Sequence, residues 1–177
     1  IGCGMGRWAY NLKQVFSLYH GIDFSEEFVK TASSAFAGEK NIKFFPMSAV
    51  DLDTSKLLKK YDLIIINGVT MYINDDNIER LFRYCGELTG ESSGIYFQES
   101  VSILRHRLTL KDFYSEDLKT RYSAIYRTSQ EYEHFFMEYL SDFEFRKDET
   151  GLLLDKDTGA REETNARYWF LRRKKIK

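Results

Sequence analysis

The chain opens on a turn with glycine at every second position, Ile1-Gly2-Cys3-Gly4-Met5-Gly6. Glycine lets this backbone adopt positive φ and come close to a ligand without a Cβ clash. The turn leads into a predicted helix over residues 7–15, whose first N–H groups have no partner inside the helix. An apolar run over residues 16–23 follows and ends at Asp23, a carboxylate that can accept hydrogen bonds from both ribose hydroxyls. Turn, helix, strand and acid in this order predict a pocket for an adenosine-bearing cofactor.

The glycine spacing separates two kinds of cofactor. A dinucleotide fingerprint needs its last glycine at position 7, where this chain has Arg7. The spacing Gly2-x-Gly4-x-Gly6 instead resembles motif I of the class I S-adenosylmethionine-dependent methyltransferases. Residues 21–27, Gly-Ile-Asp-Phe-Ser-Glu-Glu, resemble the second motif of that family. The resemblance implies S-adenosylmethionine as the cofactor, with the loop lying against its methionine and ribose portion.

The family's cofactor-binding residues can be carried over position by position. The resemblance implies that Asp23 binds the ribose and that Phe24 lies against the adenine, although core packing is an alternative for Phe24. Ser48 stands where the family commonly has an acid for the adenine amine, so that contact is weaker here. The implied cofactor-binding set is Gly2, Cys3, Gly4, Gly6, Asp23, Phe24, Ser48, Ala49, Asn67 and Gly68.

Strand and helix signals alternate through the first hundred residues, which indicates an α/β fold. We expect helices over residues 26–36, 53–60 and 75–88, and strands over residues 41–45, 61–67 and 94–99. The apolar run 61–67 is typical of a parallel strand buried on both faces. The resemblance implies a Rossmann-like, seven-stranded sheet with helices on both faces.

The second half of the chain has a different pattern. Residues 100–127 are aromatic and basic without a strand signal, and we expect a substrate lid at about 100–130. A helix over residues 129–139 follows, with an imperfect capping box of Ser129 and Tyr132. Strands are expected at 143–146, 152–154 and 165–171 with a polar loop over 155–163, and they would form the antiparallel hairpin that ends the family's sheet.

The N-terminus is short for a fold of this kind. A glycine turn of this type follows the central strand of the family's sheet, and Ile1 is the one residue available for that strand. We therefore expect residues 1–177 to be a single methyltransferase domain that is N-terminally incomplete, with strand one largely missing.

Residues for catalysis and acceptor binding should follow the carboxyl ends of the strands. The predicted catalytic residues are Tyr72, Glu99 and His106, and the predicted substrate-binding residues are Arg105, Tyr126 and Arg127. Methyl transfer needs positioning, and a base if the acceptor is a hydroxyl. Residues 122–128 resemble a segment of bacterial methyltransferases that act on sugars or small metabolites. The expected function is thus methylation of a small molecule, at a hydroxyl of a sugar or metabolite.

Composition restricts the partners. The formal net charge is −1 with 30% charged residues, which provides no field for nucleic acid or an anionic membrane. Three scattered histidines and two cysteines have no metal-ligand spacing. We expect a cytoplasmic monomer or homodimer without a metal. Two alternatives stay open: a cofactor-binding or regulatory protein without turnover, and a nucleotide-dependent oxidoreductase.

Overall fold

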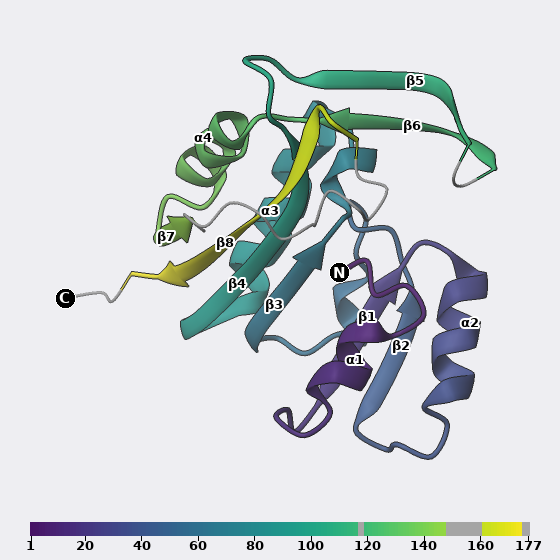
Figure 1. The fold of residues 1–177 in the computed structure, drawn as a ribbon. Coiled ribbons are helices and arrows are strands. Elements are labelled where there is room, and N and C mark those ends of the chain that lie inside the picture. Colours follow the sequence, from purple (N-terminus) through teal and green to yellow (C-terminus); the bar gives the residue numbers. More distant parts are fainter. Residues whose placement is uncertain (117–118, 148–160, 175–177) are drawn as a thin grey trace. The chain divides into compact units, whose positions relative to one another are not determined.

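The computed structural model describes residues 1–116, 119–147 and 161–174, and the chain divides into two compact units, residues 1–59 and 60–177 (Figure 1). The first unit alternates helices and strands as the sequence predicts. Its elements are α1 (Arg7–Leu12), β1 (Tyr19–Asp23), α2 (Glu26–Ala35), β2 (Ile42–Pro46) and the 3₁₀ turn η1 (Thr54–Lys56).

In the first unit, β1 and β2 are parallel, with Gly21 opposite Phe44. A Cβ at Gly21 would lie 2.6 Å from Phe44 Cδ1 and 3.0 Å from Cys3 Cβ. Glycine is therefore required for the opening turn and the β2 ring to pack against β1. The backbone N–H of Cys3 also donates to the carbonyl of Ile22 at 2.9 Å, which fixes the turn on the strand.

Three boundaries in the first unit differ from prediction. Helix α2 is confirmed, and the Ser25 side chain caps it by accepting from the Phe28 N–H. In contrast, α1 ends at Leu12 and β1 begins at Tyr19, so both elements are shorter than expected. The helix predicted over 53–60 is a single 3₁₀ turn that Asp53 caps. The residues after it bury no side chain, so no apolar face extends the helix.

The second unit is built on a mixed sheet with strand order β3-β4-β8-β7. Its elements are β3 (Tyr61–Asn67), η2 (Thr70–Tyr72), α3 (Asp75–Leu88), β4 (Thr89–Ser102), β5 (Leu108–Ser115), β6 (Thr120–Tyr126), α4 (Ser129–Tyr139), β7 (Phe143–Lys147) and β8 (Thr164–Arg173). Strands β3 and β4 are parallel, and β8 is antiparallel to both β4 and β7. The antiparallel end of the sheet is confirmed. The described strands, however, form a two-stranded, a four-stranded and a second two-stranded sheet rather than a single seven-stranded one.

Aromatic rings make the core of the second unit. The Phe97 ring of β4 lies 5.9 Å from Phe82 of α3, 5.2 Å from Phe136 of α4 and 5.7 Å from Trp169 of β8. All four side chains are buried. Helices α3 and α4 therefore pack on the same face of this sheet, and they hold β4 and β8 in place.

The prediction that residues 61–67 are buried on both faces is wrong in part. Ile64 and Ile66 are buried against the core, whereas Leu63 is 44% exposed and Asp62 is exposed. Within the second unit, the face of β3 that carries Leu63 is less covered than the face under the helices.

Residues 100–127 do contain strands, contrary to prediction. Strands β5 and β6 form an antiparallel hairpin, seen at the top of Figure 1. Most of β5 is exposed, so it shows little of the apolar alternation on which strand prediction depends. In β6, Ala124 and Tyr126 are buried against Met71 of η2, with Tyr122 packed beside them. The alternation of Tyr122, Ala124 and Tyr126 was the sequence signal that could have predicted strand β6.

Helix α4 is confirmed, but its cap lies one residue earlier than predicted. Thr128 accepts from the Glu131 N–H, and the Glu131 carboxylate accepts from the Thr128 N–H, so the capping box is complete. The strand predicted at 152–154 and most of the loop after it lie outside the described residues. Among the described residues, no helix combines the length and the apolar composition needed to cross a bilayer.

Candidate active site

The opening turn has the backbone conformation that its glycines predict. Gly2, Gly4 and Gly6 have φ of 69°, 50° and 89°, a region that favours glycine. A Cβ at Gly6 would lie 2.9 Å from the Phe36 ring, whereas one at Gly4 would meet no atom within 4 Å. Gly6 thus serves packing, and Gly4 leaves open space beside the backbone for a ligand.

Asp23 is bound to the turn. Its Oδ2 accepts from the Gly4 N–H at 2.9 Å, and its Oδ1 accepts from the Ser25 N–H at 3.0 Å. An ionised carboxylate offers about four acceptor positions, so each oxygen keeps one for a ribose hydroxyl. These residues therefore fit the predicted ribose contact, with the acid oriented before any ligand arrives.

The predicted adenine contacts lie at the surface of the first unit. Phe24 is 81% exposed, so the alternative of a core residue is wrong. Ser48 is exposed, and its hydroxyl accepts a long hydrogen bond from the Val50 N–H at 3.4 Å. Ala49 is half-buried. The exposed Phe24 ring leaves a flat apolar face available for a base.

Cys3 packs inside the turn. It is 6% exposed, and burial raises the pKa of its thiol to about 11. The side chain therefore stays a neutral thiol near pH 7, which suits packing in the turn and disfavours a nucleophile.

In the second unit, the turn after β3 is formed by Asn67 and Gly68. Gly68 has a φ of 65°, and its N–H donates to the Gln98 carbonyl at 3.0 Å. The Asn67 side chain donates to Gln98 Oε1 at 3.3 Å. The neighbouring strand β4 thus fixes the turn in which the family resemblance implies a cofactor contact.

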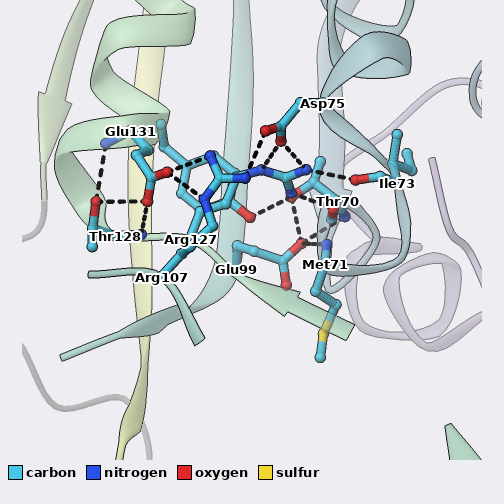
Figure 2. A network of polar contacts seen from close by, with 10 residues as sticks. Thr70, Met71, Ile73, Asp75, Glu99, Arg107, Arg127, Thr128 and Glu131 are labelled. Atoms are coloured by element: carbon cyan, nitrogen blue, oxygen red, sulfur yellow. Dashed lines mark hydrogen bonds and ion pairs between the residues drawn. The ribbon is translucent and has the colours of Figure 1, made fainter. Parts of the chain in front are cut away.

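Glu99, a predicted catalytic residue, is enclosed in the protein (Figure 2). It is 1% exposed, and its Oε2 accepts from the Thr70 N–H and hydroxyl, both at 2.7 Å, and from the Met71 N–H at 3.2 Å. Its Oε1 accepts from the Ser100 N–H. Burial raises the pKa of Glu99, although these hydrogen bonds act in the opposite direction. The geometry favours Glu99 as the residue that holds η2 against β4, rather than as a base.

Arg127 was predicted to bind substrate, yet it is fully buried. Its guanidinium donates to Asp75 Oδ1 at 2.6 and 2.8 Å, to the Thr70 carbonyl at 2.8 Å and to the Ile73 carbonyl at 2.6 Å. Figure 2 shows these groups around it. The guanidinium has no exposed face for an acceptor, because it joins the end of β6 to the loop between η2 and α3.

Three charged residues of this network, Asp75, Arg107 and Glu131, were not predicted as site residues. Asp75 also accepts from Arg107 at 2.6 Å, and Arg107 forms a second ion pair with Glu131. Burial would raise the pKa of Asp75, but the hydrogen bonds from Arg107 and Arg127 outweigh it and lower the pKa. The sequence signals that could have indicated them were Asp75 as an acid at a helix start and Glu131 as a carboxylate three residues after Thr128.

Tyrosine hydroxyls gather where η2 meets β6. The Tyr122 and Tyr126 hydroxyls lie 3.3 Å apart, and Tyr126 is 6% exposed. Tyr72 is 60% exposed. Desolvation of its hydroxyl, with the nearby Glu99 and Tyr122, raises the pKa of Tyr72. Tyr72 therefore stays protonated near pH 7 and can donate a hydrogen bond, which weakens its predicted role as a base.

The remaining predicted residues lie in the turn before β5. His106 and Arg105 are both exposed, and the His106 carbonyl accepts from the Ser102 hydroxyl at 2.8 Å. Across residues 1–116, 119–147 and 161–174, no three His, Cys, Asp or Glu side chains gather in a way that could hold a metal ion.

Comparison with known proteins gives a family and several relatives. The methyltransferase domain family matches residues 1–91, just over half of the chain. Phosphoethanolamine N-methyltransferase 3 of Arabidopsis thaliana is 27% identical over 162 residues, which cover 90% of this chain and 31% of that protein. The chain thus spans about a third of the length of this curated relative.

Two solved structures show the same fold. A putative S-adenosylmethionine-dependent methyltransferase from Listeria monocytogenes matches with a TM-score of 0.74 at 13% identity, over 99% of this chain and 89% of that one. The O-methyltransferase of a trans-AT PKS multienzyme from Brevibacillus brevis, in complex with S-adenosyl-L-homocysteine, matches with a TM-score of 0.69 at 13% identity. That match covers 98% of this chain and 65% of the solved chain.

Proposed function

The chain belongs to the S-adenosylmethionine-dependent methyltransferases, and we propose that it transfers a methyl group from that cofactor to a small-molecule acceptor. The family match argues against a nucleotide-dependent oxidoreductase, as does Arg7 in the last glycine position of a dinucleotide fingerprint. Binding without turnover remains the second candidate.

The observation that supports this proposal most is the hydrogen bond between Gly4 and Asp23. It joins the glycine turn to the acid at the end of β1, so two of the predicted cofactor contacts form one rigid unit. Phe24, the next residue, carries an exposed ring. A backbone open to a ligand, an oriented carboxylate and a flat apolar face suit the methionine portion, the ribose and the adenine of S-adenosylmethionine.

Transfer of the methyl group is a displacement that depends on alignment. When bound, S-adenosylmethionine supplies a methyl group on a positively charged sulfur. An acceptor lone pair can attack the methyl carbon and displace the sulfur from it. We expect Asp23, held by the opening turn, to orient the ribose. Holding two reactants in this way can contribute much of the rate enhancement without a strong base.

The methylated atom is a finer part of the proposal. We propose a hydroxyl of a sugar or metabolite, following the resemblance of residues 122–128. Two observations favour an amine as the second candidate. The buried Glu99 and the protonated Tyr72 are poor bases, and an uncharged amine needs none. The relatives' names also divide, since one is an N-methyltransferase and another an O-methyltransferase.

Calorimetric titration with S-adenosylhomocysteine tests the cofactor assignment. We expect Asp23→Asn to bind about 10- to 100-fold more weakly, the range for hydrogen bonds to a charged group. Glu39→Gln, which changes an exposed acid of the same unit, should bind like the wild type. Unchanged affinity in a folded Asp23→Asn variant would contradict the ribose role.

An acceptor panel tests the reaction. Release of S-adenosylhomocysteine is measured with sugars, small phenols and phosphoethanolamine as acceptors. Turnover on hydroxyl acceptors supports the proposal, and turnover on phosphoethanolamine alone replaces the hydroxyl by an amine. Tight cofactor binding with no turnover on any acceptor favours a protein that binds the cofactor without catalysing transfer.

A further inference from the structure

A pocket of about 490 Å³ lies in the second unit, at the end of β4. It is lined by the apolar side chains of Val101, Ile103 and Leu104, by the start of α4 at Ser129, and by the cationic Lys147 and Arg167. None of the residues that the sequence predicts for cofactor, acceptor or catalysis lines it. Its volume lies in the range of small-molecule sites.

Arg167 has a buried donor without a partner. Its Nη1 is shielded from solvent and forms no hydrogen bond to the described residues. In the ladder between β4 and β8, Arg167 pairs with Glu99, but the Glu99 oxygens already accept from Thr70, Met71 and Ser100. A buried N–H of a charged group that lacks an acceptor costs free energy. Because Nη1 itself is shielded from solvent, an acceptor from outside the protein would reach Arg167 through the part of its half-buried side chain that lines the pocket.

The other charges at the pocket are compensated. Lys147 Nζ lies 3.1 Å from Glu133 Oε1, which also accepts from the indole N–H of Trp169. The Glu131 carboxylate, in the first turn of α4, is engaged by Thr128 and Arg107. Of the two cations that line the pocket, Arg167 is the one without an ion pair to a described residue.

The start of α4 adds a second source of donors. Thr128 accepts from the Glu131 N–H, whereas the amides of Ser129 and Gln130 belong to the first turn, which the helix itself leaves unpaired. Both residues line the pocket. The partial positive charge at a helix N-terminus favours an anion near these amides.

We propose that this pocket binds a small organic anion. Its carboxylate or phosphate accepts from Arg167 and from the first turn of α4, and its apolar part lies against Val101, Ile103 and Leu104. The inference does not depend on the proposed methyl transfer.

The test is a thermal-shift and calorimetric titration of the full chain at constant ionic strength. The probes are inorganic phosphate, butyl phosphate, acetate and butyrate, which separate the two anion chemistries and the contribution of the apolar walls. We expect one butyl-bearing probe to raise the unfolding temperature more than its parent anion does. Arg167→Gln should weaken that binding at least about tenfold. Arg172→Gln, which removes an exposed arginine from the same strand, should not.

Three outcomes would overturn the proposal: no shift with any probe, an equal loss in both variants, or full binding by Arg167→Gln. Without the probes, Arg167→Gln should unfold at the wild-type temperature or above it, because the lost donor was unpaired. A lower unfolding temperature would assign Arg167 an internal structural role instead. Titration of the same variants with S-adenosylhomocysteine keeps the two proposals separate, since Arg167→Gln should bind it normally.

Discussion

Arg127→Met should destabilise the chain strongly. Methionine retains much of the apolar volume of the arginine stem but donates no hydrogen bond. The change leaves the Ile73 carbonyl without its donor, leaves the Thr70 carbonyl with the Ile73 N–H alone, and removes an ion pair with Asp75.

The size of the stability loss depends on which contacts the former partners of Arg127 retain. Removing one member of a buried pair costs about 3–5 kcal/mol. Asp75 is 40% exposed and keeps Arg107 at 2.6 Å, so its charge is not stranded and the lower end of that range applies. The Ile73 carbonyl adds about 1 kcal/mol, and the Thr70 carbonyl adds less because it keeps the Ile73 N–H. The sum is about 4–5 kcal/mol, or a fall of about 8–20 °C in Tm.

Urea unfolding followed by far-UV circular dichroism and by tryptophan fluorescence measures this loss. Arg83→Met is the matched control, since it breaks an exposed pair with Glu79 and should cost about 0.5 kcal/mol. Arg127→Lys should recover little, because one ammonium cannot reproduce the planar fork. A loss below about 1 kcal/mol for Arg127→Met would refute the reasoning.

Three further perturbations test other parts of the chain. Gly6→Ala should destabilise the chain by about 2 kcal/mol, since the φ of Gly6 is 89° and its Cβ would lie 2.9 Å from the Phe36 ring. Gly38→Ala, where a Cβ would meet open space, should be near neutral in the same urea titration. Because burial raises the pKa of Glu99, the folded state binds its proton at a higher pH than the unfolded state does. The wild type should therefore gain stability relative to Glu99→Gln as pH falls from about 7 to 5, and a constant difference between their urea midpoints would contradict this. Cys3, with a pKa of about 11, should react with iodoacetamide at pH 8 far more slowly in the folded chain than in urea, and equal rates would disprove its burial.

Local signals predicted the first unit well. The glycine turn and the Ser25 cap each act within a few residues, so sequence alone defines them, and the order of turn, helix, strand and acid indicated Asp23, which accepts from Gly4 across 19 positions. The sequence also predicted α3 and α4, because their apolar spacing is regular. The family resemblance, carried by the opening glycines, is confirmed by the family match over residues 1–91.

The second unit was harder because its polar residues act over long sequence distances. Arg127 reaches Asp75 across 52 positions, and Glu99 reaches Thr70 across 29. A charged residue near a strand end resembles a ligand contact in the sequence, since no neighbouring residue shows that another charge neutralises it. Burial of a charged side chain depends on tertiary partners, so these residues were assigned to the site rather than to its support.

The hairpin of β5 and β6 has a consequence for where a chain of this kind can vary over evolution. It is attached through the small cluster of Met71, Ala124 and Tyr126, and most of β5 is exposed. Substitutions at exposed positions usually alter stability little, so this segment can accumulate sequence changes that selection for a stable fold does not remove. Arg127, one residue beyond the hairpin, has no such freedom. Variation is therefore tolerated along the exposed part of β5 and constrained at Ala124, Tyr126 and Arg127, a contrast that an alignment of relatives would show as a rise in conservation toward the end of β6.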